Sequence, residues 1–368
     1  MELLAQLTKW LLAIILLLNI RAFPTVWHFR IFRPLIYIWT SHLVLKVKSI
    51  FLSKSAKEEA FERWIDALTP IGATPFQSTV FRSWASIDES DYNFHLSNSS
   101  YAKALDAARF KLACQLLPKF LIAGGVIPLA GTHFQFVREI PILAKYEVRV
   151  TLEAWDEKWI YIVCRFVSKR QVKNKDSPQS KRDGTEPNSP TFFHAPISSS
   201  GVSMASTPVE GTGTKPMSPT DMDKLASRLL ATDEPDGATL HTITVSQMCF
   251  KMGRITVPPA VVFAVNGLCV PPPSVSLDGT TSSDNLVHEP YSRANPPPHW
   301  AEVKAITSKL HGGSIRKLQT FLKGGWKEVP EGERWWEKAM GGALELRRKE
   351  NLEALDILRK GMEGARRI

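Results

Sequence analysis

The residues best suited to chemistry in this chain gather in one stretch, IDESDYNFHLSNSSYAKALDAARF. Asp91, His95 and Asn98 stand there in the spacing D-x-x-x-H-x-x-N, just ahead of a helical pattern. One interpretation is an ordinary helix start, in which Ser97 or Asn98 caps free backbone N–H groups and nearby acids favour the positive helix end. A calcium loop fits poorly, because the acids lack the one-three-five oxygen spacing and no glycine makes the sharp turn.

The second interpretation is a reaction site built on the same helix start. Unpaired N–H groups at a helix N-terminus can polarise a carbonyl or hold a developing oxyanion. A carboxylate beside them could act as a nucleophile or as a general base on water, so no serine is needed. The sequence also lacks the G-x-S-x-G turn of serine hydrolases. His133, in GTHFQF, could face a substrate or could be a plain core or surface histidine.

No metal or other cofactor is expected. Four scattered cysteines, none in C-x-x-C spacing, argue against both a zinc site and a disulfide framework. They suggest reduced, mostly buried thiols in a protein that faces the cytosol.

Several predicted elements must position this stretch. A strand pattern at 79–87 leads into it, and apolar residues at three- and four-residue steps predict a long helix from about 97 to 116. Three strand-like runs follow (IPLAGTHFQFV, YEVRVTLEAW and WIYIVCRFVSK), and the WDEK turn makes the last two a hairpin. After an irregular insertion, TLHTITVSQMCFKM reads as one more strand. One helix with a run of antiparallel strands is an α+β pattern, and the hotdog fold is one such arrangement.

These patterns divide the chain into seven segments. We predict a hydrophobic anchor with an interfacial segment (1–50), a connecting helix (51–75), the first part of the main domain (76–170), a disordered insertion (171–238), the last part of the domain (239–270), a Pro-rich linker (271–298) and a basic helical tail (299–368).

The N-terminal segment predicts membrane attachment. Trp10 to Leu18 is uninterrupted apolar, and no A-x-A-like cleavage site follows. Arginines and lysines after it place the body of the protein in the cytosol, at the endoplasmic reticulum or another endomembrane. The net charge of +10 could also indicate nucleic acid, but the basic residues form no long stripe and the tail has few interleaved aromatics. We therefore expect a membrane partner and no nucleic acid.

Three motifs in order resemble one family. DYNFHLSNSSY resembles the D-x-x-x-H-x-N-N-x-x-Y signature of hotdog-fold acyl-CoA thioesterases of the 4-hydroxybenzoyl-CoA type. LEAWDEKWIYIVCRFVSK resembles a strand–turn–strand of thioesterase superfamily member six, and RITVPP resembles that group's R-x-x-x-P-P segment. The order of segments is similar to that of fungal thioesterase-like proteins, some of them encoded beside lipopeptide or polyketide biosynthetic genes.

The resemblance implies an acyl thioesterase that acts on a CoA or carrier-bound thioester in fungal lipid or secondary-metabolite biosynthesis. It also implies a homodimer with the acyl tunnel between protomers. It implies that Asp91 is the catalytic residue and that His95 and Asn98 orient substrate or water. Two positions depart from the family pattern: Ser97 replaces its first Asn, and Glu89 stands where an Asp often precedes the catalytic one. The competing hypothesis is an inactive hotdog domain that binds acyl chains or scaffolds partners at a membrane.

Overall fold

The computed structural model describes residues 1–169, 234–272 and 289–364. The predicted insertion (171–238) and the predicted linker (271–298) therefore lie mostly outside the described residues.

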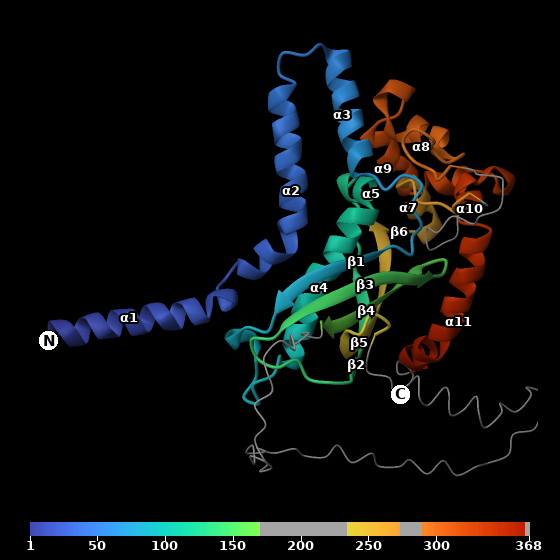
Figure 1. Ribbon diagram of the computed structural model, residues 1–368. Coiled ribbons are helices and arrows are strands. Elements are labelled where there is room, and N and C mark those ends of the chain that lie inside the picture. Colours follow the sequence, from blue (N-terminus) through green and yellow to red (C-terminus); the bar gives the residue numbers. More distant parts are fainter. Residues whose placement is uncertain (170–233, 273–288, 365–368) are drawn as a thin grey trace, which may run out of the picture. The chain divides into compact units, whose positions relative to one another are not determined.

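An antiparallel sheet forms the centre of the fold (Figure 1). Its main strands follow the spatial order β1-β3-β4-β5-β2, and a short β6 pairs with β5. The strands are β1 (Ser78–Trp84), β2 (Leu129–Phe136), β3 (Lys145–Trp155), β4 (Trp159–Ser168), β5 (Thr239–Met252) and β6 (Ile255–Val257).

Local sequence explains the central hairpin of β3 and β4. Tyr146, Val148 and Val150 alternate with polar residues along β3, and all three are buried on one face of the sheet. In the turn that follows, Asp156 Oδ1 accepts hydrogen bonds from the backbone N–H groups of Lys158 (2.8 Å) and Trp159 (2.7 Å). An aspartate that binds its own backbone favours a tight turn. The predicted hairpin is confirmed.

The long helix α4 (Asn98–Leu116) packs against β1 and β3. Its inward face carries Tyr101, Leu105 and Leu112, each no more than 3% exposed. Small buried residues such as Ala104 and Ala108 let the helix approach the sheet closely, and the short helix α5 (Pro118–Ile122) continues from its end. The α+β class predicted from the sequence is confirmed.

Three helices precede the sheet. They are α1 (Glu2–Leu18), α2 (Val26–Lys48) and α3 (Lys54–Leu68), with a 3-10 turn, η1 (Ile20–Ala22), after α1. No residue of α1 is buried, whereas α2 packs along α4.

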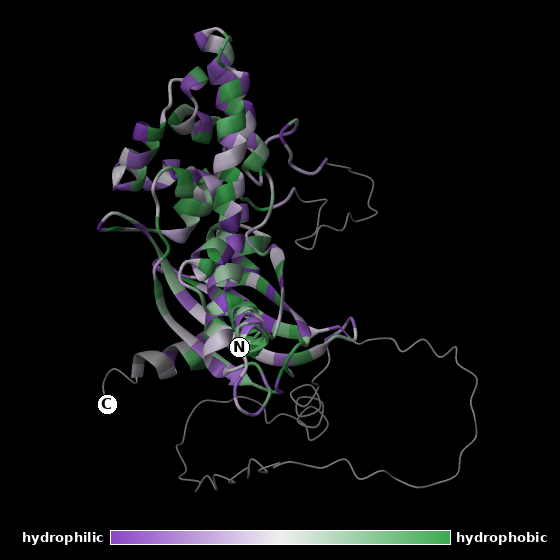
Figure 2. Ribbon diagram, turned by 90° about the vertical axis from the view of Figure 1, so that its left-hand side faces the viewer, coloured by the Kyte–Doolittle hydropathy of each residue, from purple (hydrophilic) through white to green (hydrophobic). Residues whose placement is uncertain are grey.

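These helices do not support the predicted hydrophobic anchor (1–50) as a membrane-spanning segment. A membrane span needs about 20 apolar residues, and α1 has 17 residues in all. Charged residues interrupt α2. Figure 2 shows hydrophilic residues between hydrophobic ones in the helices that rise above the sheet. Over residues 1–169, 234–272 and 289–364, no helix combines the length and the apolar character that crossing a membrane requires.

Helices also follow the sheet. They are α7 (Pro259–Val265), α8 (Trp300–Thr307), α9 (Ile315–Leu322), α10 (Trp335–Ala339) and α11 (Ala343–Gly364). Leu318, Trp336 and Leu344 from these helices belong to the same buried cluster as the inward face of α4. Arg348 Nη1 also donates to the Trp155 carbonyl at the end of β3 (2.6 Å). The tail is thus part of the core.

Candidate functional site

Asp91 opens a tight turn ahead of α4. Its Oδ1 accepts hydrogen bonds from the backbone N–H groups of Asn93 (2.9 Å) and His95 (3.4 Å), and its own N–H donates to the His95 carbonyl (2.8 Å). Phe94 closes the turn at a φ of +62°, a conformation that costs a non-glycine residue energy. Within the described chain, Asp91 Oδ2 makes no hydrogen bond. One carboxylate oxygen therefore fixes the turn, and the other is available to a substrate.

His95, Ser97 and Asn98 follow this turn into the helix. His95 Nε2 lies 3.4 Å from Glu139 Oε2, and its side chain is partly exposed. Ser97 occupies the N-cap position, but its Oγ pairs with Ser100 Oγ (2.9 Å) and not with a helix N–H group. Asn98 is exposed as the first helical residue. The structure thus brings these three residues together with Asp91 at the start of α4.

The N–H groups at this helix start are only partly engaged. The Ser97 N–H donates to the Glu89 carbonyl (3.0 Å), and the Ser100 N–H donates to the Ser97 carbonyl (2.9 Å). The Asn98 and Ser99 N–H groups belong to the first turn of α4, whose N–H groups have no partner within the helix. These are donors that could polarise a substrate carbonyl.

Glu89 links the helix start to the N-terminal helices, a role that the sequence did not indicate. Its side chain, only 5% exposed, pairs with Arg21 of η1 (2.7 Å) and with Arg30 of α2. The Glu89 carbonyl accepts a hydrogen bond from the Ser100 hydroxyl (2.8 Å). Burial alone would raise the pKa of the Glu89 carboxyl, but the hydrogen bonds and charges of the two arginines outweigh it, and the pKa is lowered. Glu89 is therefore ionised and structural.

Tyr101, the last residue of the motif, and the candidate His133 lie outside this turn. Tyr101 is buried, and its ring packs edge-on against Phe136 and Phe166, with centroids 5.2 and 4.9 Å away. His133 is exposed on β2, opposite Val245 of β5. Because successive strand residues point to opposite faces, His133 faces away from the α4 side that its neighbour Thr132 contacts. His133 is separated from the Asp91 group.

A cavity of about 440 Å³ runs beside the second half of α4. Its walls are mostly apolar and come from α2, α4, α5 and the sheet. Representative lining residues are Trp27, Ile31, Leu112, Leu116, Ile160 and Met248. Asp91 does not line this cavity. The volume and the lining are typical of a site for an apolar ligand.

Arg109 and Asp106 add charge to this apolar cavity, and sequence reasoning missed both. Arg109 is buried, four residues after Leu105 and three before Leu112, so it stands on the inward stripe of α4. An arginine inside an apolar helical stripe was the signal that could have identified it. The Arg109 guanidinium donates hydrogen bonds to Asp106 Oδ1 (2.7 Å) and to the Ser246 hydroxyl (2.8 Å).

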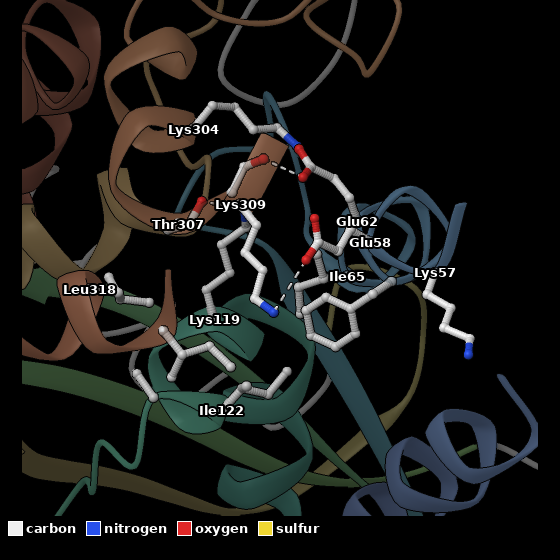
Figure 3. A pocket seen from close by; sticks show the side chains of 14 residues that line it. Lys57, Glu58, Glu62, Ile65, Lys119, Ile122, Lys304, Thr307, Lys309 and Leu318 are labelled. Atoms are coloured by element: carbon white, nitrogen blue, oxygen red, sulfur yellow. Dashed lines mark hydrogen bonds and ion pairs between the residues drawn. The ribbon is translucent and has the colours of Figure 1, made fainter. Parts of the chain in front are cut away.

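A second cavity, of about 290 Å³, lies among α3, α5, α8 and α9 (Figure 3). Lys304 Nζ contacts Glu62 Oε1 (2.5 Å) and Asp66 Oδ2 (2.6 Å) beside it. Lys119, 3% exposed, stacks its ammonium on the Trp300 ring at 4.4 Å. Burial lowers the pKa of Lys119 to about 8. The two lysines pair with the acids of α3, so we interpret this cluster as a set of ion pairs that hold the helices together.

The cysteines lie where the sequence suggested. All four are free and buried, and burial raises the pKa of Cys114, Cys164 and Cys269 to about 12. Such thiols are poor nucleophiles. In the part of the chain that the structure describes, no group of three or more His, Cys, Asp or Glu side chains could hold a metal ion.

Residues 84–180 match the model of the Thioesterase-like superfamily. The resemblance to thioesterase-like proteins is confirmed. The matched segment begins at the last residue of β1 and includes the Asp91 turn, all of α4 and the β3–β4 hairpin. The candidate site therefore lies within the thioesterase-like segment.

Curated relatives agree with this match. The chain is 30% identical over 165 residues to the Saccharomyces cerevisiae protein named "Probable thioesterase YBR096W", covering 44% of this chain and 66% of that protein. It is 29% identical over 194 residues to "Thioesterase lcsJ" of Purpureocillium lilacinum, covering 45% and 60%. Protein THEM6 of Xenopus laevis is 31% identical over 80 residues, covering 21% and 39%. The chain thus spans less than two thirds of the length of these relatives.

Proposed function

We propose that this protein is an acyl thioesterase that hydrolyses an acyl-CoA or a carrier-bound acyl thioester. One observation carries the proposal: Asp91 presents an unbonded carboxylate oxygen at the N-terminus of α4, inside the thioesterase-like segment. The named thioesterases among its relatives support the same reaction. A role in lipid or secondary-metabolite biosynthesis is a further prediction from the resemblance.

The proposed reaction uses the two features of this helix start. The free N–H groups of the first turn of α4 polarise the thioester carbonyl and stabilise negative charge on its oxygen. Asp91 Oδ2 either removes a proton from an attacking water molecule or attacks the carbonyl carbon itself. The carbon–sulfur bond breaks, the thiolate takes up a proton, and water supplies the hydroxyl of the released acid. His95 and Asn98 orient the water or the substrate, and no cofactor is required.

The proposal extends to the hotdog arrangement and to a homodimer. Packing of α4 against an antiparallel sheet supports the fold. Since Asp91 does not line the cavity beside α4, a second copy of the chain could complete the site around it. A molar mass from light scattering equal to one chain, in a preparation that hydrolyses thioesters, would contradict the dimer.

Asp91→Asn tests the catalytic assignment. Asparagine keeps an oxygen that can accept the two turn hydrogen bonds, so the fold should survive, but it is a poor base and nucleophile. We expect kcat for acyl-CoA hydrolysis to fall by at least about 100-fold, the usual scale for loss of a general base. Glu157→Gln, which removes an exposed acid from the β3–β4 turn, is the matched control and should keep full activity. Equal turnover by wild type and Asp91→Asn would contradict the assignment.

An acyl-binding or scaffold protein is the second candidate. Two observations favour it. Asp91 Oδ1 already accepts hydrogen bonds within the turn, and the apolar cavity lies elsewhere along α4. Saturable binding of acyl chains without turnover of any acyl-CoA or carrier-bound thioester would favour this function over the first.

We also propose that α1 and α2 place the protein at the surface of a membrane. Large apolar side chains such as Trp10, Phe29 and Trp39 are exposed on them, and Lys46 and Lys48 lie near the end of α2. Exposed apolar residues with nearby basic residues suit an anionic, cytosol-facing lipid surface, as at the endoplasmic reticulum. The full chain should float with anionic vesicles and less with neutral ones. Equal absence from both fractions would contradict this placement.

A further inference from the structure

The cavity beside α4 has one polar position in an otherwise apolar lining. Arg109 is held there by three side chains: its Nη1 donates to Ser246 Oγ (2.8 Å) and Thr132 Oγ1 (3.1 Å), and its Nη2 donates to Asp106 Oδ1 (2.7 Å). Arg109 and Asp106 both line the cavity. The arginine side chain is 7% exposed, and that of Asp106 is 42% exposed.

These contacts leave unused hydrogen-bonding groups on two residues that line the cavity. A guanidinium has five N–H donors, and the described residues engage three of them. The Nε–H and one Nη2–H of Arg109 are left, together with Oδ2 of Asp106, which makes no hydrogen bond in the described chain. A plain alkyl chain filling the cavity would cover these groups without pairing them, which is costly.

We propose that this cavity selects acyl chains that carry a neutral oxygen substituent, a hydroxyl or a keto group, bound by Arg109 and Asp106. A hydroxyl can accept from Arg109 and donate to Asp106, and a keto oxygen can accept from Arg109. A carboxylate fits less well, because Asp106 already neutralises the arginine and would repel a second anion. The proposal deepens the proposed function and rests on it for the position of the thioester.

The position of the thioester determines where along the acyl chain the oxygen substituent lies. With the thioester carbonyl at the N-terminus of α4, Asp106 lies eight residues further along the helix, which corresponds to about 12 Å at 1.5 Å per residue. The recognised substituent therefore lies in the middle of the acyl chain and not beside the carbonyl carbon.

Direct binding tests the selection without requiring hydrolysis. Fatty-acid primary amides of one chain length, either plain or with a hydroxyl or keto group near the carbonyl or in mid-chain, would be titrated into the full chain by calorimetry. At least one mid-chain hydroxyl or keto amide should bind about tenfold more tightly than the plain amide, as expected for one additional satisfied polar pair. Equal binding of all the amides, or a preference only for substitution beside the carbonyl, would overturn the proposal.

Two variants separate recognition from a structural ion pair. Arg109→Met keeps the apolar length and removes the donors, so it should abolish the preference while still binding the plain amide. If Arg109 were only structural, plain and oxygenated amides would lose affinity equally. Asp106→Asn offers a second readout should the methionine variant not fold. Its amide N–H can donate to a keto oxygen, so the ratio of keto to hydroxyl affinity should rise; an unchanged ratio would overturn the role of Asp106.

The same measurements distinguish this inference from the proposed function. If the wild type binds oxygenated amides selectively but hydrolyses no thioester, the proposed hydrolase function is contradicted and the proposed oxygen-binding position is supported. Turnover of plain and oxygenated thioesters alike, with equal affinities, would keep the hydrolase and overturn the selection.

Discussion

At the residue scale, neighbouring acids at one helix start have different roles because their surroundings differ. Asp91 is half-buried and keeps one oxygen open, whereas Glu89 is buried and paired with two arginines. We therefore propose that Asp91 carries the chemistry of the stretch, whereas Glu89 holds its shape.

Replacing Glu89 with Gln should destabilise the fold. The change leaves Arg21 and Arg30 without their partner, and we expect the free energy of unfolding at neutral pH to fall by about 2 to 3 kcal/mol, below the range for a fully buried pair because the arginines are partly exposed. Because the folded-state pKa of Glu89 is lowered, its contribution is present above the unfolded value of 4.5 and is lost as pH falls through the folded value.

Urea unfolding at several pH values measures both effects. The difference between wild type and Glu89→Gln should shrink in acid. Glu331→Gln, whose side chain is 87% exposed, is the control and should change stability by less than about 0.5 kcal/mol. A difference that is constant between neutral and acid pH would argue against an ionised Glu89.

At the element scale, α5 is held by groups distant in sequence. Asn266, at the end of α7, is fully buried, and its Oδ1 accepts from the Lys119 backbone N–H (2.8 Å). The Lys119 side chain then joins α5 to α3 and α8 through Asp66, Thr307 and Trp300. Burial removes water from the Lys119 ammonium, so keeping this lysine charged costs free energy in the folded state.

This cost predicts an unusual pH dependence. The pKa of Lys119 is about 8 in the folded state and about 10.5 when unfolded. Between these values the unfolded chain binds more protons, so the contribution of Lys119 to stability rises with pH. From pH 7 to pH 9, the stability of wild type relative to Lys119→Met should rise by about 1 kcal/mol.

Comparing the two proteins is necessary because the buried cysteines have the opposite effect. Their raised pKa values mean that unfolded thiols ionise first and that stability falls above about pH 9. Both proteins share this loss, so it cancels in the difference. Parallel stability curves for wild type and Lys119→Met from pH 7 to pH 9 would show that Lys119 does not titrate there.

At the scale of the whole molecule, the C-terminal helices complete the core of the thioesterase-like segment. Leu344 and Trp336 are buried in the cluster that also holds Leu105 and Phe263. Asn351 of α11 donates to the Glu153 carbonyl of β3 (2.7 Å). The match to the family model ends long before these helices, yet they pack against the same core and bond to β3, so we expect the sheet to depend on them.

Leu344→Ala tests this dependence. Leu344 is fully buried, so its truncation should lower the free energy of unfolding by about 2 to 5 kcal/mol. Leu346→Ala, two residues away on the same helix and 66% exposed, makes the same chemical change and should cost less than about 0.5 kcal/mol. Equal and small effects in denaturant unfolding would mean that α11 is only loosely attached.

Neighbouring residues alone were enough to predict the main elements and the motif. The periods of β3, β4 and α4, the turn at Asp156 and the spacing around Asp91 are local properties, so they can be read from neighbouring residues. The same patterns predicted an N-terminal membrane anchor, but α1 has 17 residues and is shorter than the roughly 20 apolar residues that a span needs. Hydrophobicity alone does not fix where a helix ends.

Contacts between distant side chains could not be predicted in the same way. Arg109 binds Ser246, 137 residues away, and Lys304 binds Glu62, 242 residues away. Such contacts depend on how the sheet orders its strands and where the last helices pack, and no local period records that. For this reason the sequence located the catalytic candidate Asp91, whereas the cavity, its polar position and the ionic support of the helix start became visible only in the folded chain.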